Sequence, residues 1–137
     1  MAIAYDTRRA KLKKYAVQNN KYEIICATGK INNNSRKVAI ICVYLPPKQT
    51  IQVTKEVENC LADCILKLKS ELNDPMIIVG GDLNKKSIND AFKESQDIKM
   101  HNPIPTRGTA ALDIVFSNLA AHEERSLPPL SLSLIHI

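Results

Sequence analysis

Four polar residues with chemically useful side chains stand beside apolar segments of this sequence. The run IIVGGDLN ends in Asp82 and Asn84, CVYLPP contains Tyr44, and TAALDIVF holds Asp113 within an apolar segment. Loops that follow strand ends place polar groups on a rigid base, so these positions are candidates for a shared site. Carboxylate and amide oxygens are also the ligands that hard cations prefer.

Each of these residues has a purely structural interpretation as well. An Asp-x-Asn sequence after a strand often forms a turn, because both side chains hydrogen-bond to nearby backbone. Tyr44 fits a half-buried strand position with its hydroxyl in water. Asp113 is harder to explain in this way, since a carboxylate among apolar neighbours costs free energy unless a strand end or a partner such as histidine relieves it. The residue types alone leave both interpretations open.

Strands are predicted on both sides of the Asn-rich turn INNNSRK. The segments 21–30 and 36–45 are rich in Ile and Val, and Pro46 and Pro47 stop the second. The two strands are expected to form a hairpin around the turn. A further strand is expected at the start of the chain, over 1–5.

A long amphipathic helix is predicted between residues 53 and 72. Asn73-Asp74-Pro75 stops it. Its apolar residues recur at helical spacing and form one stripe. They are Val57, Leu61, Cys64, Ile65, Leu68 and Leu72.

Shorter elements complete the order. Residues 76–79 are expected to form a strand buried on both faces. SINDAFKES, 87–95, opens with Ser87 and is expected to be a short helix with a start resembling a capping box. The segment 102–111 is expected to be a loop and 112–118 a buried strand. A sheet covered by helices accounts for this order, so the fold class is α/β or α+β.

Positive charge is concentrated in the first third of the 137 residues. Residues 1–50 carry ten Lys and Arg against two acidic residues, which gives +8, whereas 51–137 carry nine against twelve, which gives −3. This basic segment suits contact with phosphates and suits a solvated surface equally.

The composition also indicates the cellular compartment of the protein. Four cysteines lack a Cys-x-x-Cys pair or a nearby histidine, and are expected to be reduced thiols acting as small apolar residues. The sequence lacks a signal peptide's order and any apolar run of transmembrane length, so an intracellular location is expected.

Taken together and in order, VYLPP, GGDLN and LDIVFSN resemble motifs of the endonuclease/exonuclease/phosphatase superfamily, which has the deoxyribonuclease-I-like fold. PTRGTAALDIVFSN and the later LPPL are most similar to endonuclease domains of non-LTR (LINE-type) retrotransposons, which resemble apurinic-site endonucleases. The resemblance predicts a partial domain over 1–130 and a tail outside the family over 131–137. It implies part of a four-layer α/β sandwich of mixed sheets flanked by helices.

The resemblance also implies a metal-dependent phosphodiesterase that nicks DNA by water attack. Asp82 matches the residue that orients or deprotonates the water, and Asn84 matches an amide that helps to hold the phosphate and that Asp. Tyr44 matches a contact to the scissile phosphate, and Asp113 matches the carboxylate that orients the catalytic histidine.

Cofactor and partners follow from the same resemblance. Mg²⁺ or Mn²⁺ is expected on Asp82 and Asn84, and Arg107 and Lys85 are expected to meet substrate phosphate. The implied partners are DNA and, in the full element, a downstream reverse transcriptase domain. A nuclear location is expected for such a protein.

Two family segments are missing from the sequence. An early Asn and a metal-binding Glu would precede the region that MAIAY matches, and the Ser-Asp-His motif expected after LPPL is replaced by SLSLIHI. The chain is therefore expected to be an internal fragment with incomplete catalytic machinery. Two alternatives remain: a phosphatase of the same fold that acts on a small phosphoester or phosphoinositide, and a non-catalytic remnant that at most binds nucleic acid.

Overall fold

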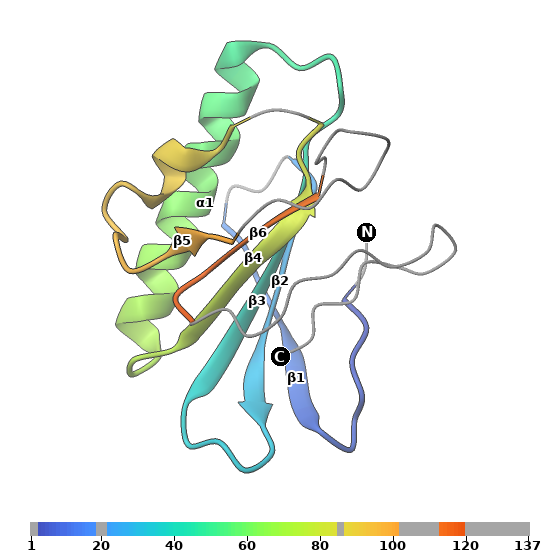
Figure 1. The fold of residues 1–137 in the computed structure, drawn as a ribbon, viewed down its shortest axis with the longest axis vertical. Helices are drawn as coiled ribbons and strands as arrows, with labels where there is room; N and C mark the ends of the chain where they lie inside the picture. Colours follow the sequence, from blue (N-terminus) through green and yellow to red (C-terminus); the bar gives the residue numbers. More distant parts are fainter. Residues whose placement is uncertain (1–2, 19–21, 85–86, 102–112, 120–137) are drawn as a thin grey trace.

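A six-stranded sheet with the strand order β1-β2-β3-β4-β6-β5 forms the frame of the molecule (Figure 1). The computed structural model describes residues 3–18, 22–84, 87–101 and 113–119. Neighbouring strands are antiparallel except β3 and β4, which are parallel. The elements are β1 (Ala10–Tyr15), β2 (Ile24–Ile31), β3 (Lys37–Tyr44), α1 (Ile51–Glu71), β4 (Met76–Asp82), η1 (a 3₁₀ helix, Asn89–Phe92), β5 (Lys99–Met100) and β6 (Asp113–Ser117).

The predicted hairpin and the long helix are confirmed. β2 and β3 pair through the Asn-rich turn, with Lys30 opposite Lys37. Helix α1 begins two residues before the predicted start, because Thr50 caps it by accepting a hydrogen bond from the Val53 N–H at 3.2 Å. The helix connects β3 to β4, as a parallel strand pair requires a crossover. No helix in the described part of the chain is long and apolar enough to cross a membrane.

Helix α1 lies on one side of the sheet (Figure 1) and the main core fills the space between them. Because side chains alternate along a strand, position decides which face each residue reaches. Ile41 and Val79 belong to the core beneath α1, whereas Val38 and Ile78 belong to a smaller cluster on the opposite face. Both faces of β4 are buried near its start, as the sequence predicted.

The first strand is not where the sequence placed it. Residues 3–5 lie outside any strand, and the neighbour of β2 is the lysine-rich segment Ala10–Tyr15. A turn separates the two, in which the Asp6 carbonyl accepts hydrogen bonds from the Arg9 and Ala10 N–H groups at 2.9 and 3.0 Å. Exposed lysines suit an edge strand, which needs charge rather than apolar side chains on its open surface. Apolar content was therefore a misleading signal here.

Three further boundaries differ from the prediction. Strand β4 continues to Asp82, so its glycines lie inside the sheet. The segment after Ser87 forms one 3₁₀ turn. Its N-cap residue, Ile88, makes no capping hydrogen bond through its side chain, so the prediction of a capping box is wrong. Strand β5 pairs with β6 and was not predicted from the sequence, because its two exposed residues carry no periodic pattern. β6 spans Asp113–Ser117, within the predicted 112–118.

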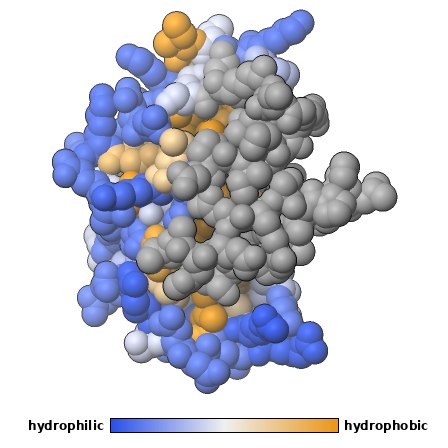
Figure 2. Space-filling view, in the orientation of Figure 1, coloured by the Kyte–Doolittle hydropathy of each residue, from blue (hydrophilic) through white to orange (hydrophobic). Residues whose placement is uncertain are grey.

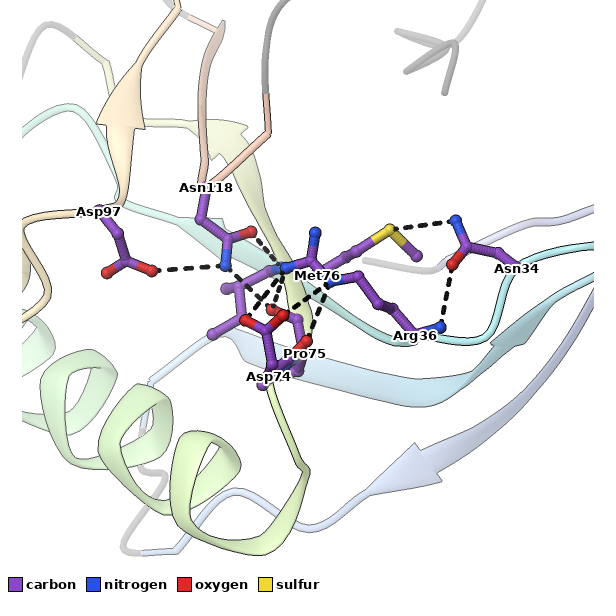
Figure 3. A network of polar contacts seen from close by, with 8 residues as sticks. Asn34, Arg36, Asp74, Pro75, Met76, Asp97 and Asn118 are labelled. Atoms are coloured by element: carbon purple, nitrogen blue, oxygen red, sulfur yellow. Dashed lines mark hydrogen bonds and ion pairs between the residues drawn. The ribbon is translucent and has the colours of Figure 1, made fainter.

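Polar side chains close the end of the sheet where β4 begins (Figure 3). Asn118 replaces a strand partner: its Oδ1 accepts from the Ile77 N–H at 2.8 Å, and its Nδ2 donates to the Pro75 carbonyl at 2.9 Å. Arg36 donates to the Asp74 carbonyl at 3.0 Å and also forms an ion pair with the Asp74 carboxylate. These contacts satisfy backbone groups that would otherwise be unpaired at the strand ends.

The cysteines behave as predicted, as reduced thiols. All four are free, and Cys26 and Cys64 are buried in the core beneath α1. Burial raises the pKa of the Cys42 and Cys60 thiols. A raised pKa keeps a thiol protonated and unreactive at neutral pH, which suits a structural role.

Replacing Gly81 with alanine is expected to destabilise the fold severely. A Cβ atom at this position would lie 1.8 Å from the Val43 carbonyl oxygen, and the Gly81 φ angle is +154°. We expect the free energy of unfolding to fall by about 3 kcal/mol or more, measured by urea denaturation. Gln96→Ala, at an exposed turn, is the control and should change it little. A loss below about 1 kcal/mol at Gly81 would contradict the close strand approach.

Tyr15 is expected to make stability fall at alkaline pH. Burial, and then its 2.8 Å hydrogen bond to the Glu71 carboxylate, raise the pKa of Tyr15 to about 12. The folded state therefore favours the protonated phenol. This contribution is fully present below about pH 10 and is lost as the pH rises through about 12. The stability difference between the wild type and Tyr15→Phe should shrink over that window in urea titrations. Tyr5→Phe, at an exposed ring, is the matched control, and a pH-independent difference at Tyr15 would refute the prediction.

Candidate functional site

Three of the four predicted site positions lie in one row at one edge of the sheet. Tyr44, the last residue of β3, is the register partner of Asp82, the last residue of β4. Asp82 is in turn the partner of Asp113, the first residue of β6. Adjacent strands are about 4.8 Å apart, so the row spans about 10 Å. The expectation that these strand tips converge is confirmed.

Alternation places this row on the face opposite α1. Val43 and Val79 are in the core beneath the helix, so their neighbours of opposite parity, Tyr44 and Asp82, belong to the other face. Both side chains are half-buried. For Asp113 the structure gives the backbone register, and its position at the start of β6 fits the strand end that would relieve the cost of burying its carboxylate.

Hydrogen bonds hold the loop after β4 against the loop after β3. The Asn84 N–H donates to Asp82 Oδ1 at 3.0 Å, which forms the turn predicted for an Asp-x-Asn sequence. Asn84 Nδ2 donates to the Leu45 carbonyl at 2.8 Å, and the Leu45 N–H donates to the Asp82 carbonyl at 3.0 Å. Leu83, 2% exposed, anchors the turn in the core. The turn that the sequence suggested for Asp82 and Asn84 is thus confirmed, and it uses Asp82 Oδ1 and the Asn84 N–H.

Other atoms of the same residues are left available. Within the described part of the chain, Asp82 Oδ2, Asn84 Oδ1 and the Tyr44 hydroxyl take part in no hydrogen bond or ion pair. Asn84 has a φ of +45°, a conformation that asparagine tolerates better than most residues. Two oxygen acceptors and one hydroxyl therefore stand at the strand tips without a protein partner among the described residues.

This donor set fits a magnesium ion that keeps most of its water. Mg²⁺ is commonly held by one or two protein carboxylates together with waters and substrate phosphate, rather than by a full protein cage. Asp82 Oδ2 and Asn84 Oδ1 are the oxygens that would hold it. The described residues contain no cluster of three or more His, Cys, Asp or Glu side chains that would form a denser site.

Gly81 has a structural purpose that the sequence did not reveal. Glycines at the end of a strand commonly allow the backbone to turn or a ligand to approach closely. Instead β4 continues through Gly81, whose missing side chain makes room for the Val43 carbonyl of the neighbouring strand. This close approach brings β3 and β4 together one residue before Tyr44 and Asp82.

The remaining predicted site residues, Arg107 and Lys85, lie outside the described residues. His101, to which the sequence assigned no role, is half-buried, and its Nε2 lies 2.5 Å from Ser117 Oγ. Leu45 was missed as a contributor, because its role depends on backbone atoms that have no sequence signature.

A cavity of about 260 Å³ lies elsewhere, between α1 and the segment that follows β1. Tyr15, Tyr22, Glu56, Cys60 and Lys67 are among the residues that line it. The Tyr15 hydroxyl donates a hydrogen bond to Glu71, and the Tyr22 hydroxyl donates one to Glu56. This cavity is on the α1 face and is separate from the row at the strand tips.

Solved structures share this fold. At a TM-score of 0.53 and 14% identity, the human Nocturnin catalytic domain with bound sulfate anion matches 82% of this chain and 49% of its own. Truncated Caenorhabditis elegans TDP2 matches with a TM-score of 0.50 and 15% identity, over 80% of this chain and 52% of its own. The sequence matches no protein-family model and none of the curated proteins compared with it.

These similarities confirm the predicted fold class, a mixed α/β sheet with helices of the deoxyribonuclease-I-like type. The chain spans about half the length of the solved structures it matches.

The contribution of Asn84 to the loop can be separated into two parts. Asn84→Ala removes the bond to Leu45 and puts a less tolerant residue at φ +45°, so we expect a loss of about 2 kcal/mol in the free energy of unfolding. Asn84→Gly removes only the bond and should lose about 1 kcal/mol. Urea denaturation of both variants tests this order. A glycine variant no more stable than the alanine variant would show that the positive φ carries no cost.

Proposed function

We propose that this chain carries the strand-tip half of a metal-dependent phosphodiesterase domain, from the DNA-nicking endonuclease of a LINE-type retrotransposon. The observation that carries the proposal is the register of Tyr44, Asp82 and Asp113 across three adjacent strand ends. These positions belong to three motifs far apart in the sequence, and the motif order is the one that the endonuclease/exonuclease/phosphatase superfamily has. The sulfate anion named for the Nocturnin domain is a tetrahedral oxyanion like phosphate, which supports a phosphoester substrate for this fold.

The residues suit hydrolysis of an anionic ester. Asp82 orients the attacking water and takes its proton, since an ionised carboxylate can accept several bonds besides the one from the Asn84 N–H. The Tyr44 hydroxyl donates to a non-bridging phosphate oxygen and adds no negative charge. Asn84 is held in place by its side-chain bond to the Leu45 carbonyl and by its backbone bond to Asp82.

A divalent cation, Mg²⁺ or Mn²⁺, supplies charge neutralisation of the phosphate when bound. Asp82 and Asn84 would hold it at the edge of the sheet. Asp113 orients a histidine in this mechanism. The Ser-Asp-His motif that would provide this histidine is not in the sequence, so full activity needs sequence beyond these 137 residues.

The finer parts of the proposal come from the sequence resemblance. The PTRGTAALDIVFSN motif favours DNA over a small phosphoester as substrate, and favours a retrotransposon protein with a downstream reverse transcriptase domain. A nuclear location accompanies a substrate of this kind. Arg107 and Lys85 are proposed contacts to the DNA phosphates.

Nicking of supercoiled plasmid tests the proposal directly. A version of the chain extended at both ends by its encoded flanking sequence should nick the plasmid in Mg²⁺ and stop when EDTA is added. Asp82→Ala in that version should lower the rate at least about 100-fold, because it removes the proposed base. Asp63→Ala, which removes an exposed carboxylate on α1, is the matched control and should leave the rate unchanged.

Two outcomes would overturn the assignment. An extended chain that folds but never nicks would favour a remnant without catalysis. Faster release of phosphate from a phosphoinositide than nicking of DNA would favour the phosphatase alternative. Circular dichroism of each variant separates a loss of the fold from a loss of chemistry.

A further inference from the structure

Three lysines from three different strands form a row at the other end of the sheet. Lys11 on β1 is the register partner of Lys30 on β2, and Lys30 is the partner of Lys37 on β3. All three are exposed. We call Lys11, Lys30 and Lys37 the lysine row. In Figure 2, the lower end of the molecule, where β1 begins and the β2–β3 turn lies in Figure 1, is mostly hydrophilic.

The face of the row follows from alternation. Lys37 shares its parity with Ala39 and Ile41, which pack beneath α1, so the row lies on the α1 face of the sheet. It lies beyond the part of that face where the core residues are. Lys13, two residues along β1, has the same parity as Lys11 and extends the positive charge.

The row is not neutralised by acids in the described part of the chain. Lys11, Lys30 and Lys37 form no ion pair there. The nearby Asp74 pairs with Arg36 instead, and Asp6 pairs with Arg8 and Arg9. Arg8, Arg9 and Arg36 of the basic first third are thus each paired with an acid, whereas the lysine row is available.

Like charges directly opposite one another on adjacent strands destabilise a sheet. Two such lysine pairs in succession lower the stability of the hairpin and of β1 pairing. Charge protects an open sheet edge at Lys11 on β1, but Lys30 and Lys37 lie on β2 and β3, which are not edge strands. An anionic ligand removes this repulsion when it binds, so the arrangement is better suited to binding than to folding.

We propose that the lysine row is a second contact surface for the phosphate backbone of DNA, remote from the strand-tip site. This inference rests on the proposed function for the identity of the polyanion. Three strands span two interstrand spacings, about 10 Å, and one strand of a duplex places about three phosphates along that length. Lys37 and Tyr44 are at opposite ends of the eight residues of β3, about 23 Å apart. The lysine row therefore binds DNA at a distance from the site of attack. This contact lengthens the time that the protein stays bound to its substrate.

The salt dependence of DNA binding tests the surface without any chemistry. Binding of the 137-residue chain to a fluorescent 30-base-pair duplex is measured by anisotropy in EDTA between 50 and 200 mM salt. Lys11→Gln/Lys30→Gln/Lys37→Gln should weaken binding at least about tenfold at 100 mM salt. It should also lower the slope of log K against log salt by up to about 2.7, which is three phosphate contacts. The matched control removes three exposed lysines outside the row, as Lys55→Gln/Lys93→Gln/Lys99→Gln.

The row variant should be at least as stable to urea as the wild type, since the repulsion is relieved. This excludes misfolding as the cause of weaker binding. Equal affinities and slopes for the row and control variants would overturn the proposal. Binding to anionic phosphatidylserine vesicles in preference to the duplex would also overturn it. Because EDTA prevents metal-dependent cleavage, a failure to nick plasmid would leave this result unaffected, and the two proposals can fail separately.

Discussion

The parallel pairing of β3 with β4 is the constraint on which the rest of the structure depends. The two strands approach so closely at Gly81 that a methyl group there would overlap the Val43 carbonyl. A parallel pair also requires a crossover, and α1 provides it while covering one face of the sheet. The register of this pair places Tyr44 beside Asp82 at one end. At the other end it leaves Lys37 beyond the start of β4, so that among the described strands Lys37 pairs with β2 alone.

The sheet consequently has two chemically different ends. The register places Tyr44, Asp82 and Asp113 where β3 and β4 end and β6 begins, and places Lys37 and its lysine neighbours where β3 begins. Under the proposed function, the phosphate backbone of DNA needs one site where a cation assists the reaction and a separate positive surface that retains the DNA. Separation along β3 keeps the lysines from competing for the oxygens of Asp82. The positive charge concentrated in the first third of the sequence thus supplies the lysines at one end of the sheet.

Backbone contacts do much of the positioning at the strand tips. Leu45 binds Asp82 through its N–H and Asn84 through its carbonyl, so the loops after β3 and β4 are held together by one residue with an apolar side chain. The turn uses one oxygen of Asp82 and one nitrogen of Asn84, and leaves the other polar atom of each side chain available. A stable turn and a functional site are therefore compatible at the same residues, and the two interpretations of Asp-x-Asn are not exclusive.

The sequence by itself determined the elements whose signals are local. Helical spacing of apolar residues located α1, the Asn-rich turn located the β2–β3 hairpin, and apolar runs located β4 and β6. The order of motifs also identified Tyr44, Asp82, Asn84 and Asp113 as candidates. Local patterns failed for β1 and β5, because an edge strand is defined by the partner it finds and not by its own apolar content.

Only the tertiary structure decided which residues are neighbours. The convergence of three strand tips, the reason for Gly81 and the alignment of Lys11, Lys30 and Lys37 all depend on register between distant segments. Register is set by packing of whole faces, since a shift of one residue would move every side chain to the opposite side of the sheet. No single segment contains that information, and so the site and the lysine row appear only when the strands are paired.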